Sequence, residues 1–345
     1  MDSAAGRVLV TGGAGYVGRF VRRALAEAGL VAIGYDDPSR AVAGVDMVGE
    51  MLVGPLEGEA LAALLRRTRP DAVVHLAGSR GGHRFNDPAG AGNHLGRNVE
   101  GTRSLLAAMA VAGPGRLVFA GSSAIYGNPA RLPAAEDAPP APTSDYGRAK
   151  LAAERLILDW AAAPERHALV LRLANVAGAD AESGLGWLPG DGTILPMAIR
   201  AATGTIPVLP VTASGPARAT AIRDYVHVGD VARAMRLAVQ RLRAHPATAV
   251  LNIGSGQARS VAEVIAITER VADRRLRVEW HESPASEPTA FVAETARAAG
   301  LLGFRAEASD LATIVGSAWR WYGRHGRAGE SAAAAGRPIA GQLGP

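Results

Sequence analysis

The sequence predicts an α/β protein with a doubly wound parallel sheet and a smaller C-terminal α/β domain. Three observations predict this class. Short apolar runs alternate with amphipathic stretches through the first half of the chain, which is the pattern of successive β–α–β units. A glycine-rich segment joins the first run to the first amphipathic stretch. After residue 175 the composition shifts to Gly, Pro and small polar residues, which indicates a second, less regular part.

In the first half, we expect a strand at each continuous apolar run and a helix at each longer amphipathic stretch. The first helix is expected to end at Gly29, because glycine readily takes the backbone conformation that closes helices. The expected strands are 7–10, 30–35, 72–76, 116–120 and 168–173. The expected helices are 16–28, 61–68, 98–112 and 146–163. Right-handed connections between parallel strands then place helices on both faces of the sheet.

The second half has fewer regular elements. We expect helices at 195–202, 228–243, 260–272 and 310–322, and a strand at 249–253. The helix at 228–243 and the strand after it are expected to return to the sheet. The predicted sheet domain is therefore 1–175 plus about 226–255, and the predicted smaller domain is 176–225 plus about 256–325. The Ala-, Gly- and Ser-rich stretch 326–345 is predicted to be a disordered tail.

Composition excludes several classes of function. The 345 residues include no cysteine, so disulfides, thiolate catalysis and cysteine-based metal sites are excluded. No apolar run reaches membrane-spanning length and the start of the chain has no signal-peptide pattern, so we expect a cytoplasmic protein without a membrane contact. The basic residues that give the net charge of +5 are scattered among Asp and Glu, which argues against nucleic-acid binding. His83 and His94 have no accompanying ligand set, so no metal site is expected.

The glycine-rich segment indicates a dinucleotide site. Gly12, Gly15 and Gly18 lie between the first strand and the first helix, where glycine permits a tight turn and a close approach of backbone amides to a pyrophosphate. Asp36 ends the second strand and can accept hydrogen bonds from the ribose hydroxyls of the adenosine while repelling a 2′-phosphate. The pattern is typical of a Rossmann-type sheet that binds NAD, although Arg40 close by leaves NADP open.

Tyr146 and Lys150 are the candidate catalytic pair. They are four residues apart, so a helix places both on one face. A free tyrosine has a pKa of about 10, and a fixed ammonium nearby stabilises its phenolate. Lys150 is the only lysine of a chain that otherwise uses arginine, which favours a chemical role for it. Ser122 follows a strand at the carboxyl edge of the predicted sheet and is the candidate to hydrogen-bond the reacting oxygen, ahead of Ser123.

With these residues placed, the chain resembles the extended short-chain dehydrogenase/reductases over about residues 7–322, and within them the branch of the UDP-galactose (UDP-glucose) 4-epimerases. The glycine turn and the Tyr–Lys pair mark the superfamily, and the later segments mark the epimerase branch. The markers are Thr11–Gly18, His75–Gly78, Asn98–Thr102, Ser122–Gly127, Tyr146–Lys150, Asn175–Ala179, Ile222–Val228 and Asn252–Gly256.

The resemblance implies an NAD-dependent nucleotide-sugar 4-epimerase. Tyr146 would take the proton of the sugar 4-hydroxyl while hydride passes from C4 to NAD and later returns to the opposite face. The cofactor contacts are expected from Gly12, Gly15, Tyr16, Val17, Gly18, Asp36, Asp37, Leu56, Leu76, Ala77, Gly78, Arg80, Asn98, Tyr146 and Lys150. The substrate contacts are expected from Ser122, Asn175, Thr193, Ile194, Leu195 and Arg223, with Arg223 on a phosphate. Relatives commonly form homodimers through the helices at 98–112 and 146–163.

Several departures from the family pattern concern the cofactor and the nucleotide sugar. Gly54-Pro55 stands where the family has a Gly-Asp whose Asp contacts adenine, and Ala174 replaces the aromatic residue that normally precedes Asn175. The family's Arg-x-Gly-Asp element aligns with Ser283-Pro-Ala-Ser286, and the tyrosine expected after it aligns with Ala290. The loop before Arg223 has become Thr212–Arg218. The hydride-transfer residues are thus present, while the residues that hold the nucleotide are substantially changed.

Three alternatives remain open from the sequence. A ketosugar reductase or sugar dehydrogenase would use the same Ser, Tyr and Lys for half of the cycle and exchange its NAD(P) with solvent. A 4,6-dehydratase is disfavoured, because Ser123-Ala124 stands where dehydratases need an Asp–Glu pair. A catalytically inactive dinucleotide-binding relative is disfavoured by the presence of Ser122, Tyr146 and Lys150.

Overall fold

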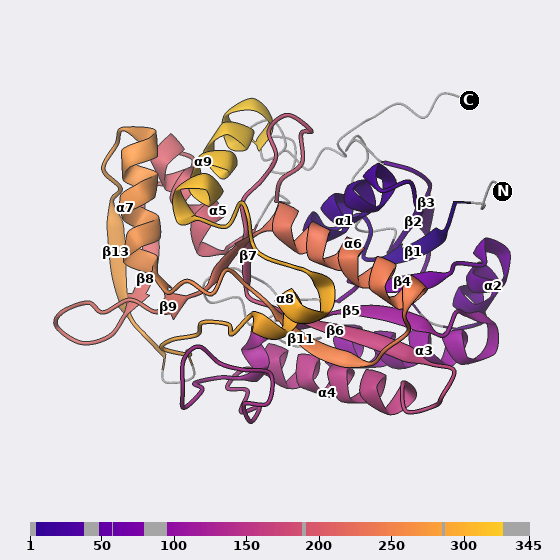
Figure 1. The fold of residues 1–345 in the computed structure, drawn as a ribbon. Coiled ribbons are helices and arrows are strands. Elements are labelled where there is room, and N and C mark those ends of the chain that lie inside the picture. The colour runs from indigo at the N-terminus through magenta and orange to yellow at the C-terminus, as the bar shows by residue number, and fades with distance from the viewer. Residues whose placement is uncertain are drawn as a thin grey trace.

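The structure is a computed structural model. It describes residues 5–37, 48–56, 58–78, 95–187, 191–284 and 287–326. The predicted disordered tail lies outside these residues, apart from Gly326. Figure 1 shows the elements in chain order from the N-terminus to the C-terminal helices.

A seven-stranded parallel sheet forms the centre of the larger part of the molecule. Its spatial order is β11-β6-β5-β4-β1-β2-β3. The chain runs outward from β1 through β2 and β3, and then crosses to the other side of β1 to build β4, β5 and β6, so the winding reverses between β1 and β4. In such a sheet, ligands bind at the carboxyl ends of the strands beside this reversal. The strands are β1 (Arg7–Thr11), β2 (Val31–Asp36), β3 (Met51–Val53), β4 (Ala72–His75), β5 (Arg116–Ser122), β6 (His167–Leu173) and β11 (Ala249–Ile253).

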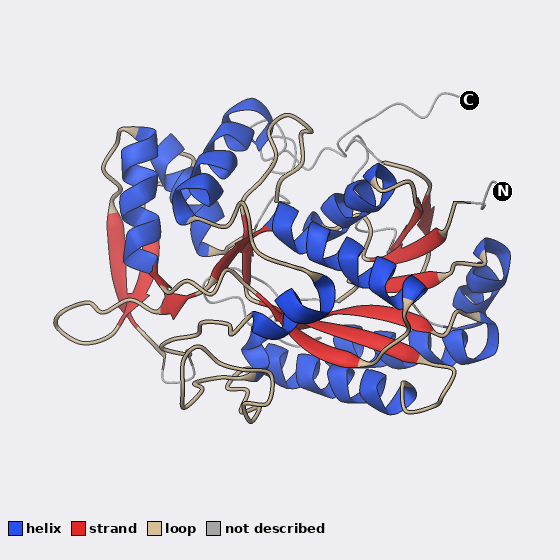
Figure 2. Cartoon of the chain, viewed as in Figure 1, coloured by secondary structure: helices blue, strands red, loops and turns tan. Residues whose placement is uncertain are grey.

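Helices cover both faces of this sheet, as Figure 2 shows. One face packs against α1 (Tyr16–Glu27), α6 (Val228–Ala244) and α8 (Ala296–Leu302), and the other against α2 (Gly58–Thr68), α3 (Gly101–Ala112) and α4 (Asp145–Trp160). Successive strand residues point to opposite faces, so Val8 and Val10 enter the first core while Leu9 enters the second. The apolar runs of the sequence are therefore continuous because the strands are buried on both sides.

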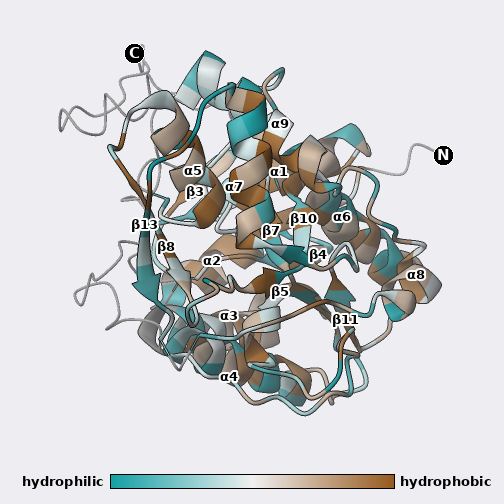
Figure 3. Ribbon diagram, turned by 90° about the vertical axis from the view of Figure 1, so that its left-hand side faces the viewer, coloured by the Kyte–Doolittle hydropathy of each residue, from teal (hydrophilic) through white to brown (hydrophobic). Residues whose placement is uncertain are grey.

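The second part of the molecule lies beyond the carboxyl ends of the strands (Figure 1). Its helices α5 (Ile194–Thr203), α7 (Val261–Ala272) and α9 (Leu311–Trp321) share a separate apolar core, and Figure 3 shows their hydrophobic segments. Short strands complete it in three pairs: β8 (Leu209–Ala213) with β13 (Val278–Glu282), β7 (Asn175–Ala177) with β10 (Tyr225–His227), and β9 (Ile222–Arg223) with β12 (Arg259–Ser260).

The predicted α/β class and the Rossmann-type sheet are confirmed, and most predicted elements agree with the observed ones to within a few residues. The helix expected at 98–112 starts earlier, with the π-helical turn η3 (Leu95–Glu100) that continues into α3. The sequence did not predict α8, β3 or the strands of the second part, because a helix of seven residues and strands of two to five residues show too little periodicity. The division of the chain into two domains stays a prediction.

The stretches that the structure describes contain neither a candidate membrane span nor a candidate metal cluster. None of the helices there has both the length and the hydropathy that a membrane span needs. No group of three or more His, Asp or Glu side chains there is arranged to hold a metal ion.

Candidate active site

A single cleft of about 1250 Å³ collects the predicted functional residues of the described stretches. It opens at the carboxyl ends of β1, β4, β5 and β6 and is bounded on its other side by α5, β8 and β9. Every residue expected to contact cofactor or substrate lines it, except Arg80, which lies outside the described residues. The cleft thus has two halves. We call the half along the sheet the reaction half and the half along 191–291 the substrate half.

The glycine turn has the geometry that the sequence predicts. Gly12 has φ +73°, and a Cβ atom there would lie 2.7 Å from the backbone nitrogen of Ala77. A Cβ atom on Gly18 would collide with the carbonyl oxygen of Gly12. Gly15 caps α1 without a side-chain hydrogen bond, so the first amides of this helix face the cleft, where an anion can accept from them. The turn therefore fits a dinucleotide pyrophosphate, because glycine lets it fold tightly and leaves the first amides of α1 at the cleft.

Asp36 has a structural role beside the predicted one. Its carboxylate is buried and accepts hydrogen bonds from the backbone nitrogens of Ala14 (3.0 Å) and Asp37 (2.9 Å). It therefore holds the end of β2 against the glycine turn while it lines the cleft. A carboxylate with this orientation can still accept from the two hydroxyls of a ribose, because each oxygen has two lone pairs.

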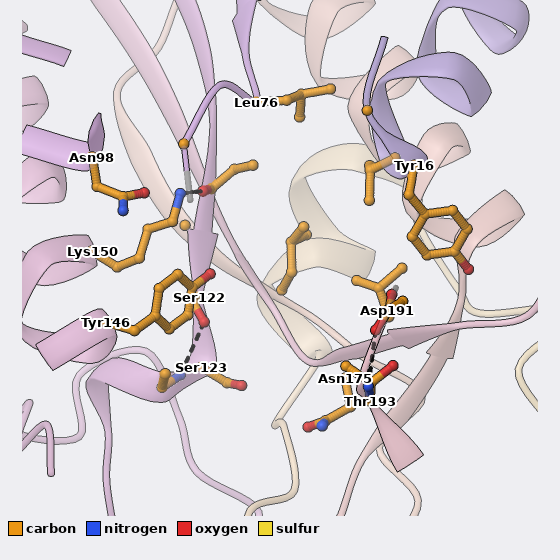
Figure 4. A pocket seen from close by; sticks show the side chains of 18 of the residues that line it. Tyr16, Leu76, Asn98, Ser122, Ser123, Tyr146, Lys150, Asn175, Asp191 and Thr193 are labelled. Carbon is orange, nitrogen blue, oxygen red and sulfur yellow. Dashed lines mark hydrogen bonds between the residues drawn. The ribbon is translucent and has the colours of Figure 1, made fainter. Parts of the chain in front are cut away.

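Lys150 and Tyr146 project from the first turns of α4. The helix begins at Asp145, where Ser144 accepts a hydrogen bond from the nitrogen of Gly147 at 3.1 Å. The ammonium of Lys150 donates to the carbonyl of Ala120 at 3.0 Å, which anchors it at the end of β5. Figure 4 shows Tyr146, Lys150 and Ser122 together on one side of the cleft, opposite Asn175 and Thr193. The i, i+4 spacing thus brings phenol and ammonium to the same wall, as predicted.

Ser122 is oriented by the turn that follows β5. Its hydroxyl oxygen accepts a hydrogen bond from the backbone nitrogen of Ala124 at 3.2 Å and caps the short 3-10 helix Ser123–Ile125 (η4). This contact uses a lone pair of the hydroxyl and leaves its proton for an acceptor in the cleft. Ser123 also lines the cleft.

A buried hydrogen-bond chain lies behind the reaction half. His75 is fully buried, with Nδ1 2.7 Å from the Thr11 hydroxyl and Nε2 3.0 Å from the Thr102 hydroxyl. Thr102 donates its only hydroxyl proton to the carbonyl of Asn98 at 2.7 Å, so Nε2 must carry the imidazole proton. Burial, and then the charge of Lys150, lower the pKa of His75 to about 3. The imidazole is therefore neutral and adds no second positive charge beside Lys150.

Arg172 fixes α4 to the sheet. Its guanidinium forms a two-pronged ion pair with Glu154 (2.6 and 3.1 Å) and donates to the Tyr126 hydroxyl at 2.7 Å and to the carbonyl of Glu136 at 2.8 Å. The Tyr126 hydroxyl in turn donates to Asn252 at 2.7 Å. Glu154 lies one turn after Lys150 on α4. The network therefore sets the position of the helix that carries the candidate catalytic pair, because its charges are buried and fully paired.

The substrate half brings together residues that are distant in sequence. Arg223 lines it and pairs with Glu287 at 3.2 Å, and burial lowers the pKa of Arg223. Asp191 also lines it and accepts from the nitrogen of Thr193 at 2.9 Å. The hydroxyl of Tyr225, buried and without a hydrogen-bond partner among the described residues, belongs to the same wall. Burial raises the pKa of Tyr225 to about 12, so it is neutral there.

Some residues of the cleft were not predicted from the sequence. Tyr225 lies in the segment Ile222–Val228 that the resemblance singles out, so the sequence did contain a signal for this residue. The sequence contains no such signal for Asp191 and Glu287, because their positions depend on loops that join elements distant in the sequence. The remaining unpredicted residues include Gly54, Pro55, Glu100, Gly101, Ser104, Met197, Pro210, Val211, Thr212, Val261, Pro288 and Phe291.

Comparison with known proteins gives a consistent result. Residues 8–254 match the model of the NAD dependent epimerase/dehydratase family. The chain is 35% identical over 330 residues to the UDP-glucose 4-epimerase of Azospirillum brasilense, with 92% of each chain covered. The UDP-glucose 4-epimerase of Streptomyces lividans is also 35% identical, over 93% of this chain and 97% of that protein.

Solved structures agree with the sequence matches. The UDP-glucose 4-epimerase of Brucella ovis in complex with NAD is 35% identical and has a TM-score of 0.83, over 92% of this chain and 99% of that one. The enzyme of Stenotrophomonas maltophila, with bound NAD and formylated UDP-arabinopyranose, has a TM-score of 0.85 at 31% identity, over 94% and 99% of the two chains. Because the family match covers most of the chain and the relatives match along nearly their whole length, this protein belongs to the NAD-dependent epimerase/dehydratase family.

Proposed function

We propose that this protein is an NAD-dependent nucleotide-sugar 4-epimerase that interconverts UDP-glucose and UDP-galactose. The observation that carries this proposal is the convergence of Ser122, Tyr146 and Lys150 on the wall between the predicted cofactor residues and the predicted substrate residues. The named relatives act on UDP-glucose or are complexes with NAD and a UDP-sugar, which supports the same substrate class.

The glycine turn, Asp36 and the residues that follow β4 would hold NAD. The N-terminus of α1 and the acidic end of β2, which line the same cleft, support this. When bound, NAD supplies a reversible hydride acceptor at sugar C4. Gly78 lies close to Asn98, whose side-chain oxygen a Cβ atom at this position would meet, and both residues line the cleft beside Lys150. Asp36 favours NAD over NADP through its negative charge.

Tyr146 would exchange the proton of the 4-hydroxyl. The oxidation of C4 releases this proton, and Tyr146 would accept it as phenolate and return it when the C4 alcohol is restored. Lys150 would stabilise the phenolate through its positive charge. His75 behind it is neutral and adds no second positive charge. Ser122 would donate its hydroxyl proton to the same sugar oxygen and hold it in line. Inversion at C4 further requires the substrate half to accept the sugar in two orientations.

The test is proton NMR of the purified protein with UDP-galactose and only catalytic amounts of NAD. Formation of UDP-glucose up to equilibrium, with no net accumulation of NADH, is the expected result. Consumption of NAD in proportion to sugar oxidised would instead identify a net dehydrogenase. A protein that binds NAD and leaves UDP-galactose unchanged would overturn the proposed substrate.

We also propose a homodimer formed through α3 and α4. Val111 on α3 supports this, because it is 77% exposed and is a large apolar side chain. Light scattering is expected to give twice the mass of the chain, and Val111→Glu is expected to shift it toward the mass of one chain. A monomeric wild-type protein would exclude the dimer.

A further inference from the structure

Glu287 lies beside the guanidinium of Arg223 in the substrate half of the cleft. One carboxylate oxygen, Oε1, accepts from Arg223 at 3.2 Å, and the other, Oε2, accepts from the Ser283 hydroxyl at 2.9 Å. The side chains are 15% exposed for Arg223 and 27% exposed for Glu287. The carboxylate is thus held from both sides, and its pairing with Arg223 is partly shielded from water, where charges interact more strongly than at an open surface.

The charges around this pair do not suit an anionic ligand. Among the described residues, the charged side chains that line the substrate half are Asp191, Arg223 and Glu287. Two acids and one base leave this half with a net formal charge of −1. A nucleotide sugar carries its negative charge on the diphosphate, and the guanidinium that could meet it here is already paired with a carboxylate. The diphosphate must therefore compete with Glu287.

We propose that Glu287 is a specificity-determining residue that competes with the substrate diphosphate for Arg223. This inference rests on the proposed function, which places a nucleotide sugar in this half. When the diphosphate takes Arg223, the carboxylate of Glu287 is left beside a bound dianion. Only a ligand that also offers hydroxyl or N–H donors, as the ribose and base of a nucleotide do, compensates the lost pairing. The residue therefore favours nucleoside diphosphates and disfavours bare polyanions.

The discriminating ligands are UDP and inorganic pyrophosphate, titrated into NAD-loaded protein by calorimetry. Glu287→Gln keeps the shape of the side chain and removes its charge. Its affinity for pyrophosphate is expected to rise by about 2- to 5-fold, the scale of a partly exposed ion pair. Its affinity for UDP is expected to rise less, so the preference for UDP over pyrophosphate narrows. Retained NAD content and an unchanged melting temperature would show that the variant is folded.

The matched control is Glu279→Gln, the same change of charge on β13 at a side chain that is 55% exposed and outside the cleft. This control is expected to leave both affinities as in the wild type. The proposal is overturned by unchanged or weaker pyrophosphate binding in Glu287→Gln, by no detectable pyrophosphate binding to that variant, or by an equal gain in the control. A gain that persists when Arg223→Ala is added would overturn it as well.

These titrations need no turnover, so they separate the two proposals. If the binding results hold and UDP-galactose is not converted, the proposed reaction fails and the competition stands. If UDP-galactose is converted and Glu287→Gln binds both ligands as the wild type does, the competition fails and the reaction stands.

Discussion

The reaction half and the substrate half of the cleft are held in place in different ways. Behind the reaction half, Lys150 and His75 are buried, and the Arg172–Glu154 pair ties α4 to the central sheet. In the substrate half, the corresponding charged pair, Arg223–Glu287, is partly open to water. The proposed catalytic residues are thus anchored to the core, whereas the proposed substrate contacts come from the edges of short strands and loops.

This difference has a consequence for substitution. A change behind the reaction half, at His75 or Arg172, disturbs buried groups that have no access to water and therefore costs stability. A change in the substrate half alters binding while water can replace the lost partner. A family can therefore keep its chemistry and exchange its substrate contacts, which is what the departures at Ser283–Ser286 and Thr212–Arg218 indicate.

The largest effect is expected from Tyr146→Phe. Without the phenol there is no group to exchange the proton of the 4-hydroxyl, so kcat is expected to fall by about 10²- to 10⁴-fold. NAD content and the melting temperature are expected to stay as in the wild type, because the ring is kept. The measurement is conversion of UDP-galactose by NMR together with release and quantification of NAD. Tyr322→Phe, the same change at a residue outside the cleft, is the control, and near-normal turnover in Tyr146→Phe would rule out the assigned role.

The next largest effect is expected from Arg172→Met. It leaves the buried carboxylate of Glu154 without its partner, which costs about 3–5 kcal/mol in the free energy of unfolding. Arg148→Met removes an exposed ion pair with Asp145 on the same helix and is expected to cost less than about 1 kcal/mol. Urea denaturation of both variants measures the difference.

The double variant Arg172→Met/Glu154→Leu sharpens this prediction. Removing both charges is expected to recover part of the lost stability, because an apolar pair leaves no buried charge unpaired. Equal losses for Arg172→Met and Arg148→Met would contradict the view that burial distinguishes the reaction half.

In the substrate half, Arg223→Ala is expected to act on binding. The loss of hydrogen bonds to a charged phosphate is worth about 1.5–3 kcal/mol, or roughly 10- to 100-fold in the dissociation constant for UDP. NAD content is expected to stay unchanged, and the loss of unfolding free energy is expected to be smaller than for Arg172→Met. Arg218→Ala, which removes a guanidinium outside the cleft, is the control. Unchanged UDP affinity in Arg223→Ala would mean that the diphosphate binds elsewhere.

The same contrast explains what could be predicted from the sequence. The glycine turn and the pair Tyr146–Lys150 are local patterns, since a strand–turn–helix or a four-residue spacing fixes their geometry without knowledge of the rest of the fold. The helix expected at 260–272 is present for the same reason, because a capping box between Ser260 and Glu263 starts it.

The substrate half could be predicted only in part. The contact between Arg223 and Glu287 spans 64 residues of sequence. It depends on how β8 pairs with β13 and β9 with β12, and strands of two to five residues carry little periodic signal. The resemblance indicated Arg223 because its neighbours match the family, but it could not indicate Glu287, which stands where the family pattern is lost.

The last of the expected effects concerns pH and again separates the two halves. His75 has a folded-state pKa of about 3 against an ordinary value of 6.5, so between these values the unfolded chain binds one proton more than the folded protein. The stability that neutral His75 contributes is therefore complete above pH 6.5 and is lost as the pH falls below it. The loss is at most about 1.4 kcal/mol per pH unit for one proton.

Urea denaturation of wild type and His75→Gln between pH 4 and pH 7 measures this contribution. Carboxylates such as Asp230 titrate in both proteins and cancel in the difference. Burial acts to raise the pKa of Asp230, but hydrogen bonds from Ser309 and neighbouring amides outweigh it and lower that pKa. The free energy of unfolding is expected to fall more steeply with decreasing pH in the wild type than in His75→Gln. Arg223→Ala is expected to keep the wild-type dependence on pH, because no buried histidine is among the described residues that line the substrate half. Equal slopes for wild type and His75→Gln would mean that folding leaves the pKa of His75 at its ordinary value of 6.5. His75 would then become charged below about pH 6.5 and add a second positive charge beside Lys150 in that range, so Lys150 would be the sole positive charge of the two only at higher pH.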